Sequence, residues 1–142
     1  MEASHIAWSK GIQLTVYLDN REGTLASLAQ FLGRHGVNIH GLTLADTEGH
    51  GYVRMIVDDT EKARQLVEDS GELAAIREVL LIRLANQPGQ LGRVLAALAA
   101  RHLNMEYGYS TGGPGGEKGL VLVPSDLDEA VAALEAMVAP SS

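Results

Sequence analysis

At 142 residues and 15.1 kDa, the chain has room for one ordinary domain or two very small ones. Its 11 basic and 18 acidic residues give a formal charge of −7, which argues against nucleic acid and anionic membranes as partners. It has no cysteine, which excludes disulfides, thiolate nucleophiles and cysteine zinc sites. No apolar stretch approaches the roughly 20 residues of a membrane-spanning helix, and we expect a cytoplasmic protein.

The first half of the chain predicts six elements in the order strand, helix, strand, strand, helix, strand. Apolar residues alternate from Leu14 to Leu18, as on a strand with one buried face. The next apolar residues are spaced three and four positions apart, as on one face of a helix: Leu25, Leu28, Ala29 and Leu32. Three strands and a second helix complete this half: strands over 39–45, 52–57 and 76–84, and a helix between Asp59, its N-cap, and Gly71.

The second half repeats this pattern. A shift of 66 positions places residues of the first half on identical residues of the second, among them Asn20 on Asn86, Gly23 on Gly89, Leu25 on Leu91 and Asn38 on Asn104. The repeat predicts a helix from Leu91, strands over 105–110 and 119–123, and a last helix over 127–138 that Asp126 and Glu129 cap. Only four residues follow Val138, so the second copy lacks a final strand, and residues 73–84 are expected to serve both copies.

Each copy has the element order of a ferredoxin-like βαββαβ unit, in which both helices pack on one face of the sheet. We therefore expect an α+β protein with a first unit over 1–74 and a second over 75–142. The units are expected to lie side by side and share one antiparallel sheet with its helices on one face. Pairing of 39–45 with 105–110 would make this sheet continuous, with seven or eight strands. Exposed sheet edges and an open sheet face favour a homodimer.

Two matched motifs carry a family resemblance. Asp19-Asn-Arg-Glu-Gly-Thr-Leu25 with Gly36-Val-Asn-Ile39, and Asn86-Gln-Pro-Gly-Gln-Leu91 with His102-Leu-Asn-Met105, resemble the signature of ACT domains, the small-molecule-binding regulatory modules of amino-acid metabolism. The resemblance covers nearly the whole chain and extends to free-standing tandem ACT proteins, which have no attached enzyme. It departs at Glu22, where the family favours proline. It implies a non-enzymatic regulatory protein that binds a free amino acid at the interface between two ACT domains.

The resemblance also implies a set of site residues. A loop that enters a helix offers N–H groups to a carboxylate, and amide or carboxylate oxygens accept from an ammonium group. The implied residues are Asp19, Asn20, Gly23, Thr24, Leu25 and Asn38 in the first unit, and Asn86, Gly89, Gln90, Leu91 and Asn104 in the second. The second unit is expected to bind more tightly, because Pro88 preorganises its loop whereas Glu22 adds a negative charge to the first.

The same residues are also compatible with a purely structural role. Asn and Gly are common in turns that lead into helices for backbone reasons alone, and Asn38 and Asn104 can satisfy the turn into an edge strand. The five histidines show no metal-ligand spacing, and no nucleophile and base can be placed in one pocket, so neither a metal, a cofactor nor an enzymatic activity is expected. The alternative function is a ligand-free oligomerisation or regulatory-subunit module that partners an enzyme of amino-acid metabolism.

Overall fold

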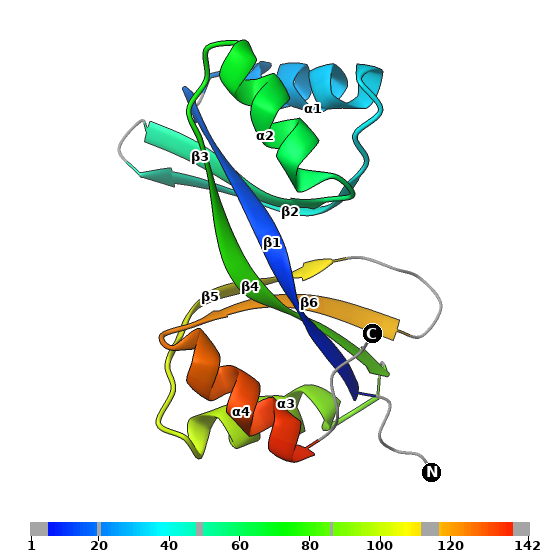
Figure 1. Cartoon of the computed structure of the whole chain (residues 1–142), viewed down its shortest axis with the longest axis vertical. Helices are drawn as coiled ribbons and strands as arrows, with labels where there is room; N and C mark the ends of the chain where they lie inside the picture. Colours follow the sequence, from blue (N-terminus) through cyan, green and yellow to red (C-terminus); the bar gives the residue numbers. More distant parts are fainter. Residues whose placement is uncertain (1–5, 20, 48–49, 86, 112–116, 138–142) are drawn as a thin grey trace. The chain divides into compact units, whose positions relative to one another are not determined.

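The structure, a computed structural model, describes residues 6–19, 21–47, 50–85, 87–111 and 117–137 (Figure 1). Six strands and four helices follow one another in the order β1 (Ile6–Asp19), α1 (Thr24–Arg34), β2 (Ile39–Thr47), β3 (His50–Val57), α2 (Thr60–Asp69), β4 (Ala74–Ala85), α3 (Gln90–Ala99), β5 (Met105–Thr111), β6 (Glu117–Pro124) and α4 (Leu127–Met137). The predicted element order is confirmed in both halves. The six strands form a sheet with the order β2-β3-β1-β4-β6-β5.

The chain divides into two compact units, and the boundaries fall inside the two longest strands. The first unit is Ile12–Glu78, and the second is Val79–Ser142 together with Met1–Gly11. The N-terminal half of β1 therefore belongs with the second unit and its C-terminal half with the first. The boundary expected from the sequence, between residues 74 and 75, is at the start of β4. The observed boundary lies inside β4, between Glu78 and Val79.

In the first unit, α1 and α2 pack on the same face of β1 and β3. Their apolar faces meet the inward side chains of the two strands in one core: Leu14, Val16, Leu28, Leu32, Val37, Val53, Met55, Val57, Ala63 and Val67. Alternate residues of β1 and β3 enter this core because successive side chains of a strand point to opposite faces. The antiparallel register, with Leu14 opposite Met55 and Asp19 opposite His50, fixes which residues meet.

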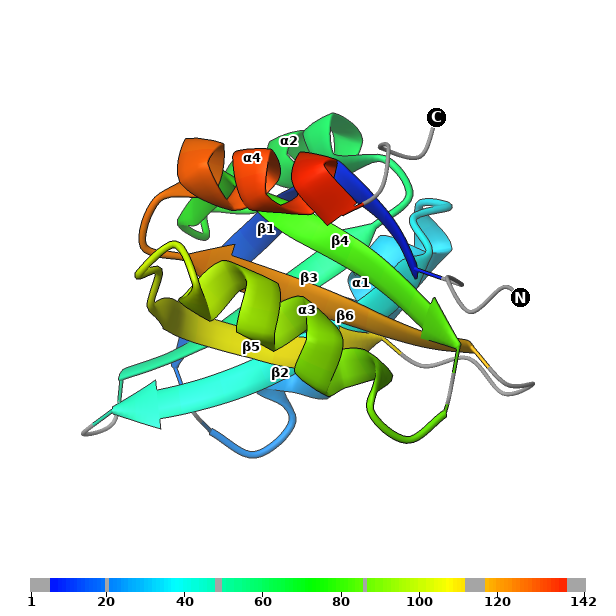
Figure 2. The same ribbon diagram turned by 90° about the horizontal axis from the view of Figure 1, so that it is seen from below.

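In the second unit, α3 and α4 cover one face of β4 and β6 (Figure 2). Two residues from the start of the chain complete this core, Ile6 and Trp8, which are 5% and 3% exposed. They pack in one cluster with Leu80, Ile82 and Leu84 of β4. The prediction that the second unit lacks its final strand is therefore wrong, because the N-terminal half of β1 supplies that strand.

Two further expectations about the sheet are also wrong. The strands expected to pair, 39–45 in β2 and 105–110 in β5, lie at the two ends of the strand order. The sheet has six strands rather than seven or eight. Two separate four-stranded units would need eight strands. Only six are needed because β1, with 14 residues, and β4, with 12, each belong to both units. The sheet is therefore continuous through its longest strands and leaves β2 and β5 as its end strands.

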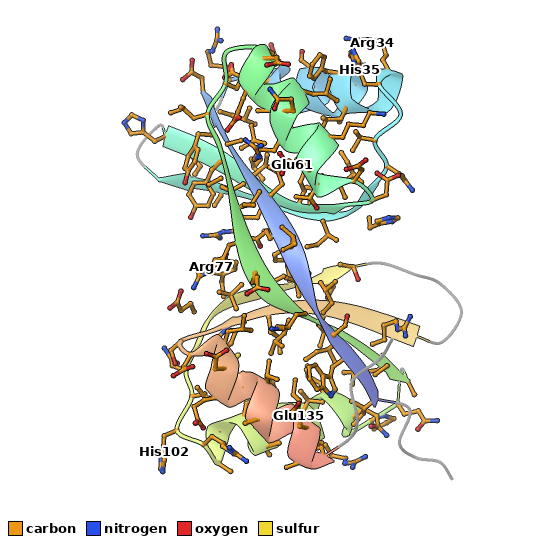
Figure 3. All side chains as sticks on the ribbon, viewed as in Figure 1. Arg34, His35, Glu61, Arg77, His102 and Glu135 are labelled. Carbon is orange, nitrogen blue, oxygen red and sulfur yellow. The ribbon has the colours of Figure 1, made fainter. Side chains whose placement is uncertain are left out.

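Local signals set the helix ends. Oδ1 of Asp59 accepts from the N–H of Lys62 at 3.1 Å, and Oδ1 of Asp126 accepts from the N–H of Glu129 at 3.1 Å, which confirms Asp59 and Asp126 as caps. The carboxylate of Glu129 pairs with Arg101 instead, at 3.4 Å. Gly36 ends α1 in the left-handed conformation, with φ 83°, and His102 takes the equivalent position after α3 with φ 60° (Figure 3).

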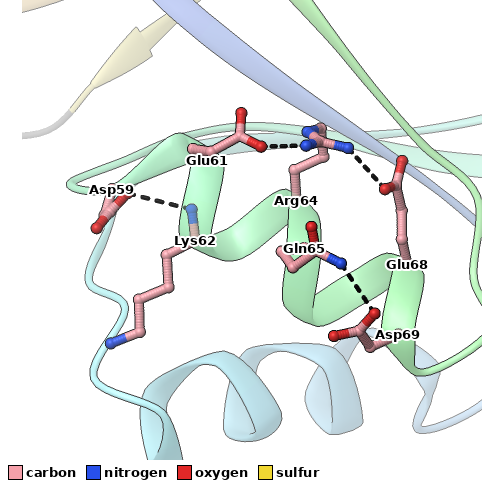
Figure 4. A network of polar contacts seen from close by, with 7 residues as sticks. All are labelled: Asp59, Glu61, Lys62, Arg64, Gln65, Glu68 and Asp69. Atoms are coloured by element: carbon pink, nitrogen blue, oxygen red, sulfur yellow. Dashed lines mark hydrogen bonds and ion pairs between the residues drawn. The ribbon is translucent and has the colours of Figure 1, made fainter.

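The exposed side of α2 carries a row of charged and amide side chains (Figure 4). Arg64 bonds the carboxylates of Glu61 and Glu68, the latter at 2.6 Å, and Gln65 donates to Asp69 at 2.9 Å. These partners are three or four positions apart, which places them on one side of the helix. The hydrogen bond and charge of Arg64 outweigh desolvation and lower the pKa of Glu61 below its ordinary value.

Candidate functional site

The loop between β1 and α1 in the first unit is a tight turn fixed by its own backbone. The N–H of Arg21 donates to the carbonyl of Asp19 at 2.9 Å, and the N–H of Thr24 donates to that of Arg21 at 3.2 Å. The hydroxyl of Thr24 is within 2.9 Å of both carbonyls. Gly23 then enters the helix with φ 87°, a conformation that favours glycine. This turn presents the first N–H groups of α1 at its outer surface.

The loop between β4 and α3 in the second unit has the same backbone hydrogen bonds between residues 66 positions later in the chain. The N–H of Gln87 donates to the carbonyl of Ala85 at 2.8 Å, and the N–H of Gln90 donates to that of Gln87 at 3.4 Å. Gly89 enters the helix with φ 89°. The sequence repeat is therefore also a repeat of backbone geometry.

The side chains of the two loops differ in charge. In the first loop, the guanidinium of Arg21 lies 3.8 Å from the carboxylate of Asp19, and Glu22 follows. The equivalent residues of the second loop are all neutral: Ala85, Gln87 and Pro88. Asn20 and Asn86, the amides on which the predicted site is centred, lie outside the described residues.

A groove of about 530 Å³ opens beside the first loop, within the first unit. Its apolar lining comes from Leu18, Leu28 and Phe31. Its charged and polar lining comes from three elements, the loop, α1 and the segment after α2: Asp19, Arg21, Glu22, Gly23, Thr24, Ser27, Ser70 and Glu72. The groove thus offers both signs of charge above an apolar floor.

Two smaller cavities adjoin this groove and share residues with it. One, of about 210 Å³, lies at the start of α1 and is lined by Leu18, Arg21, Gly23, Thr24, Leu25, Ala26, Leu44 and Gly51. Arg21 is the charged residue of this lining. The other, of about 330 Å³, lies between the ends of β1 and β4 and is lined by Tyr17, Leu18, Asp19, His50, Gly51, Gly71, Glu72 and Leu73.

The structure brings some of the predicted site residues together. In the first unit, Asp19, Gly23 and Thr24 line the groove, and Leu25 lines the smaller cavity at the start of α1. In the second unit, Gly89, Gln90 and Leu91 form the start of α3, where Gln90 is 8% exposed and Leu91 packs against the core.

Asn38 and Asn104 lie elsewhere in their units. The N–H of Asn38 donates to Oδ1 of Asp58 at 3.0 Å, and its carbonyl accepts from the N–H of Asp58 at 3.1 Å. Asp58 follows β3, whose first residue, His50, is opposite Asp19. Because β3 has eight residues, its ends are about 23 Å apart. Asn38 therefore lies far from the first loop of its own unit.

Asn104 repeats this arrangement in the second unit. Its N–H donates to Oγ of Ser125 at 3.2 Å, and its carbonyl accepts from the N–H of Ser125 at 2.8 Å. In both units the asparagine directly precedes an end strand, and its backbone forms hydrogen bonds with the residue that directly follows the neighbouring strand. These bonds use only backbone groups of the asparagines, so the role of the two side chains in ligand binding stays a prediction.

The predicted site residues include only three that line the groove and leave out eight, among them Arg21, Ser70 and Glu72. Alignment of the two copies contains a signal for Arg21, because it is a charged residue opposite the neutral Gln87 in a loop of otherwise equal length. Ser70 and Glu72 carry no such signal. They reach the groove because α2 ends beside the first loop, which only the folded chain reveals.

The groove and the adjoining cavity at the start of α1 together contain the kinds of group that complement a small zwitterion. Arg21 is a cation, and the N–H groups of Leu25 and Ala26 at the start of α1 have no backbone acceptor among the described residues. Asp19, Glu22 and Glu72 are carboxylates that can accept from an ammonium group. Over the parts of the chain that the structure describes, no three His, Asp or Glu side chains are grouped as metal ligands.

None of the helices in the described segments is long and apolar enough to cross a membrane.

Comparison with known proteins identifies the family. A search of curated proteins gave no match. Among solved structures, a protein from Bacteroides thetaiotaomicron aligns with a TM-score of 0.85 at 29% sequence identity. The alignment covers 92% of this chain and 90% of the Bacteroides chain.

Two structures of the regulatory subunit of aspartate kinase share the fold. That from Thermus thermophilus, in a ligand-free form, has a TM-score of 0.69 at 16% identity and covers 94% of this chain and 95% of its own. That from Thermus flavus has a TM-score of 0.64 at 16% identity and covers 96% and 99%. The family model described as an ACT domain pair matches residues 10–138, and the chain therefore belongs to the ACT domain pair family.

Proposed function

We propose that this chain is a non-enzymatic regulatory protein that binds a free amino acid, and that the first unit holds the binding site. The observation that carries the proposal is the groove of about 530 Å³ beside the loop between β1 and α1. It combines a cation, three carboxylates and an apolar floor, and a free amino acid has a carboxylate, an ammonium group and a side chain to match them.

The same observations favour the first unit over the second, contrary to the expectation from Pro88. Both loops have the same backbone hydrogen bonds, so the two loops differ in their side chains rather than in these bonds. The charged side chains are confined to the first loop. That the site is shared with a neighbouring ACT domain, through Asn38 or Asn104, stays a prediction.

A thermal-shift screen with the twenty proteinogenic amino acids tests this proposal. A ligand that binds only the folded state raises its stability by about 2.7 kcal/mol at a hundredfold excess over Kd. The matched variants are Ser27→Trp, which fills the groove from the exposed side of α1, and Arg93→Trp at the equivalent exposed position of α3. We expect a shift for at least one amino acid that Ser27→Trp abolishes and Arg93→Trp retains. No shift for any amino acid in the wild type contradicts the proposal.

A second candidate function is a ligand-free module that partners an enzyme of amino-acid metabolism. It is favoured by the fold shared with aspartate kinase regulatory subunits over nearly the whole length of both chains. The end strand β2 also exposes two leucines, Leu42 at 39% and Leu44 at 45%, which suit association with another chain. An absent thermal shift favours this candidate. Sedimentation tests the expected homodimer, which a monomer at micromolar concentration and above would contradict.

A further inference from the structure

The first half of β4 is a free edge of the sheet, although β4 lies in the middle of the strand order. In the antiparallel register of β4 and β6, Leu80 is opposite Leu122. Two positions further along, Glu78 is opposite Pro124, the residue at which β6 ends. Ala74–Arg77 therefore extend past the end of β6. Within the described part of the chain, their neighbouring strand in the sheet is β1 alone.

The backbone of this edge has hydrogen-bonding groups that point away from β1. The N–H of Tyr17 in β1 donates to the carbonyl of Leu73 at 3.0 Å. In an antiparallel sheet, the N–H and C=O of one residue point to one side and those of the next residue to the other. Leu73 and Ala75 thus face β1, whereas Ala74 and Ile76 face outward. The edge offers two donors and two acceptors to a further strand.

The side chains of this edge are apolar and exposed. Leu73 is the most exposed large hydrophobic residue of the described segments, at 73%, and Ile76 is 49% exposed. Ala75, between them, is also exposed. An edge strand with outward backbone groups and exposed apolar side chains is suited to pairing with another strand.

The second unit has a free edge as well, in the first half of β1, but it carries a lysine. The register of β1 and β3 places Val57, the end of β3, opposite Ile12, so residues 6–11 extend past β3. The exposed residue among them is Lys10. Charged side chains, lysine above all, keep edges from pairing. The edge of the first unit has the exposed Ile76 in its middle instead.

We propose that the edge Ala74–Arg77 binds an extended segment of another protein, which adds a strand to the sheet of the first unit. The main chain of this segment pairs with Ala74 and Ile76, and its apolar side chains cover the exposed ones of the edge. Exposed carboxylates precede and follow the edge, at Glu72 and Glu78, and the whole chain carries −7. The segment is therefore apolar in its middle and basic at both ends.

A second copy of this chain fits the edge less well than a basic segment does. The antiparallel pairing of two copies that uses both Ala74 and Ile76 is centred on Ala75. It places Glu72 of each copy opposite the partner's Glu78. Like charges directly opposite each other destabilise a strand pair, and two chains of charge −7 repel each other.

The first part of the test compares two peptide probes by NMR and hydrogen exchange. In the free protein, the amides of Ala74 and Ile76 should exchange about tenfold faster or more than that of Ala75, which is bonded to β1. The peptide acetyl-Lys-Val-Thr-Val-Thr-Val-Lys-amide should bind and protect both outward amides. Its counterpart with glutamate in place of both lysines should bind about tenfold more weakly.

The second part uses matched variants of the edge. Ile76→Pro removes an outward N–H and leaves those that face β1, so it should fold but lose the peptide. Ile76→Ala keeps the N–H and should bind less well than the wild type but better than Ile76→Pro. Ala75→Pro removes an N–H that faces β1 and should unfold at a lower temperature than Ile76→Pro.

Four results would overturn the inference. These are equal exchange rates at Ala74, Ala75 and Ile76, no binding of the lysine peptide by the wild type, equal affinity for the two peptides, and equal peptide binding by Ile76→Pro. A dimer in sedimentation that Ile76→Pro dissociates would mean that a second copy occupies the edge, which overturns the choice of partner. None of these measurements involves a free amino acid, so they leave the proposed function untouched.

Discussion

Gly23 and Gly89, 66 positions apart, hold the same left-handed backbone conformation at the start of a helix, with φ 87° and 89°. A Cβ atom added at either position would meet no other atom within 4 Å. The cost of alanine therefore comes from the backbone alone, about 1–2 kcal/mol. Urea denaturation of Gly23→Ala and Gly89→Ala should give similar losses in the free energy of unfolding. An unchanged stability in either variant would contradict the left-handed conformation at that position.

Trp8, the chain's single tryptophan, tests the role of β1 in the second unit. It is 3% exposed in the core that α3 and α4 cover, so Trp8→Ala should lower the free energy of unfolding by about 3–5 kcal/mol. The exposed Lys10 of the same strand is the control, and Lys10→Ala should change stability little. A wild-type emission spectrum typical of tryptophan in water would show that Trp8 is not in this core.

Thr24 links the two carbonyls of the first loop through its hydroxyl, at 2.9 Å from each. Thr24→Val keeps the shape of the side chain but removes the single O–H donor that the two carbonyls share, and should lower the free energy of unfolding by about 0.5–1.5 kcal/mol. Thr24→Ser keeps the hydroxyl and should stay close to the wild type. Chemical denaturation measures both, and equal stabilities of the valine and serine variants would contradict the role of the hydroxyl.

The pair formed by Glu61 and Arg64 predicts a pH dependence. The hydrogen bond from Arg64 lowers the folded-state pKa of Glu61 below its ordinary value of 4.5, so the stabilisation is fully present above that pH. It is lost as the pH falls through the lowered pKa of the folded state. Arg64→Gln should therefore be less stable than the wild type at pH 7, and the difference should shrink on acidification below about pH 4.5. A difference that grows in acid would contradict this assignment.

The sequence predicts most of the fold because the two copies support each other. Alternation from Leu14 to Leu18 and the helical spacing from Leu25 to Leu32 are local patterns, and the second copy repeats them at a fixed offset. What it does not predict is the use of Ile6 and Trp8. These residues complete a core formed more than 70 positions later, and a repeat comparison contains no equivalent for them.

The sequence likewise predicts only part of the candidate site. Asp19, Gly23 and Thr24 belong to a loop whose motif is visible in the sequence, and the groove lies beside that loop. Asn38 shares the motif but lies near Asp58, at the far end of β3, because β2 runs parallel to β1 and so starts at the end of the sheet opposite the loop. Residues that belong to one sequence motif therefore need not lie close together in the folded unit.

The most direct test of the central claim is a two-dimensional ¹⁵N–¹H NMR titration with the amino acid that gives the largest thermal shift. If the first unit holds the site, the backbone amide signals of Arg21, Gly23, Thr24 and Leu25 should move and saturate at one ligand per chain. The equivalent signals of the second loop, from Gln87 to Leu91, should stay in place. Movement confined to the second loop, or equal movement in both loops with two ligands bound, would contradict the account.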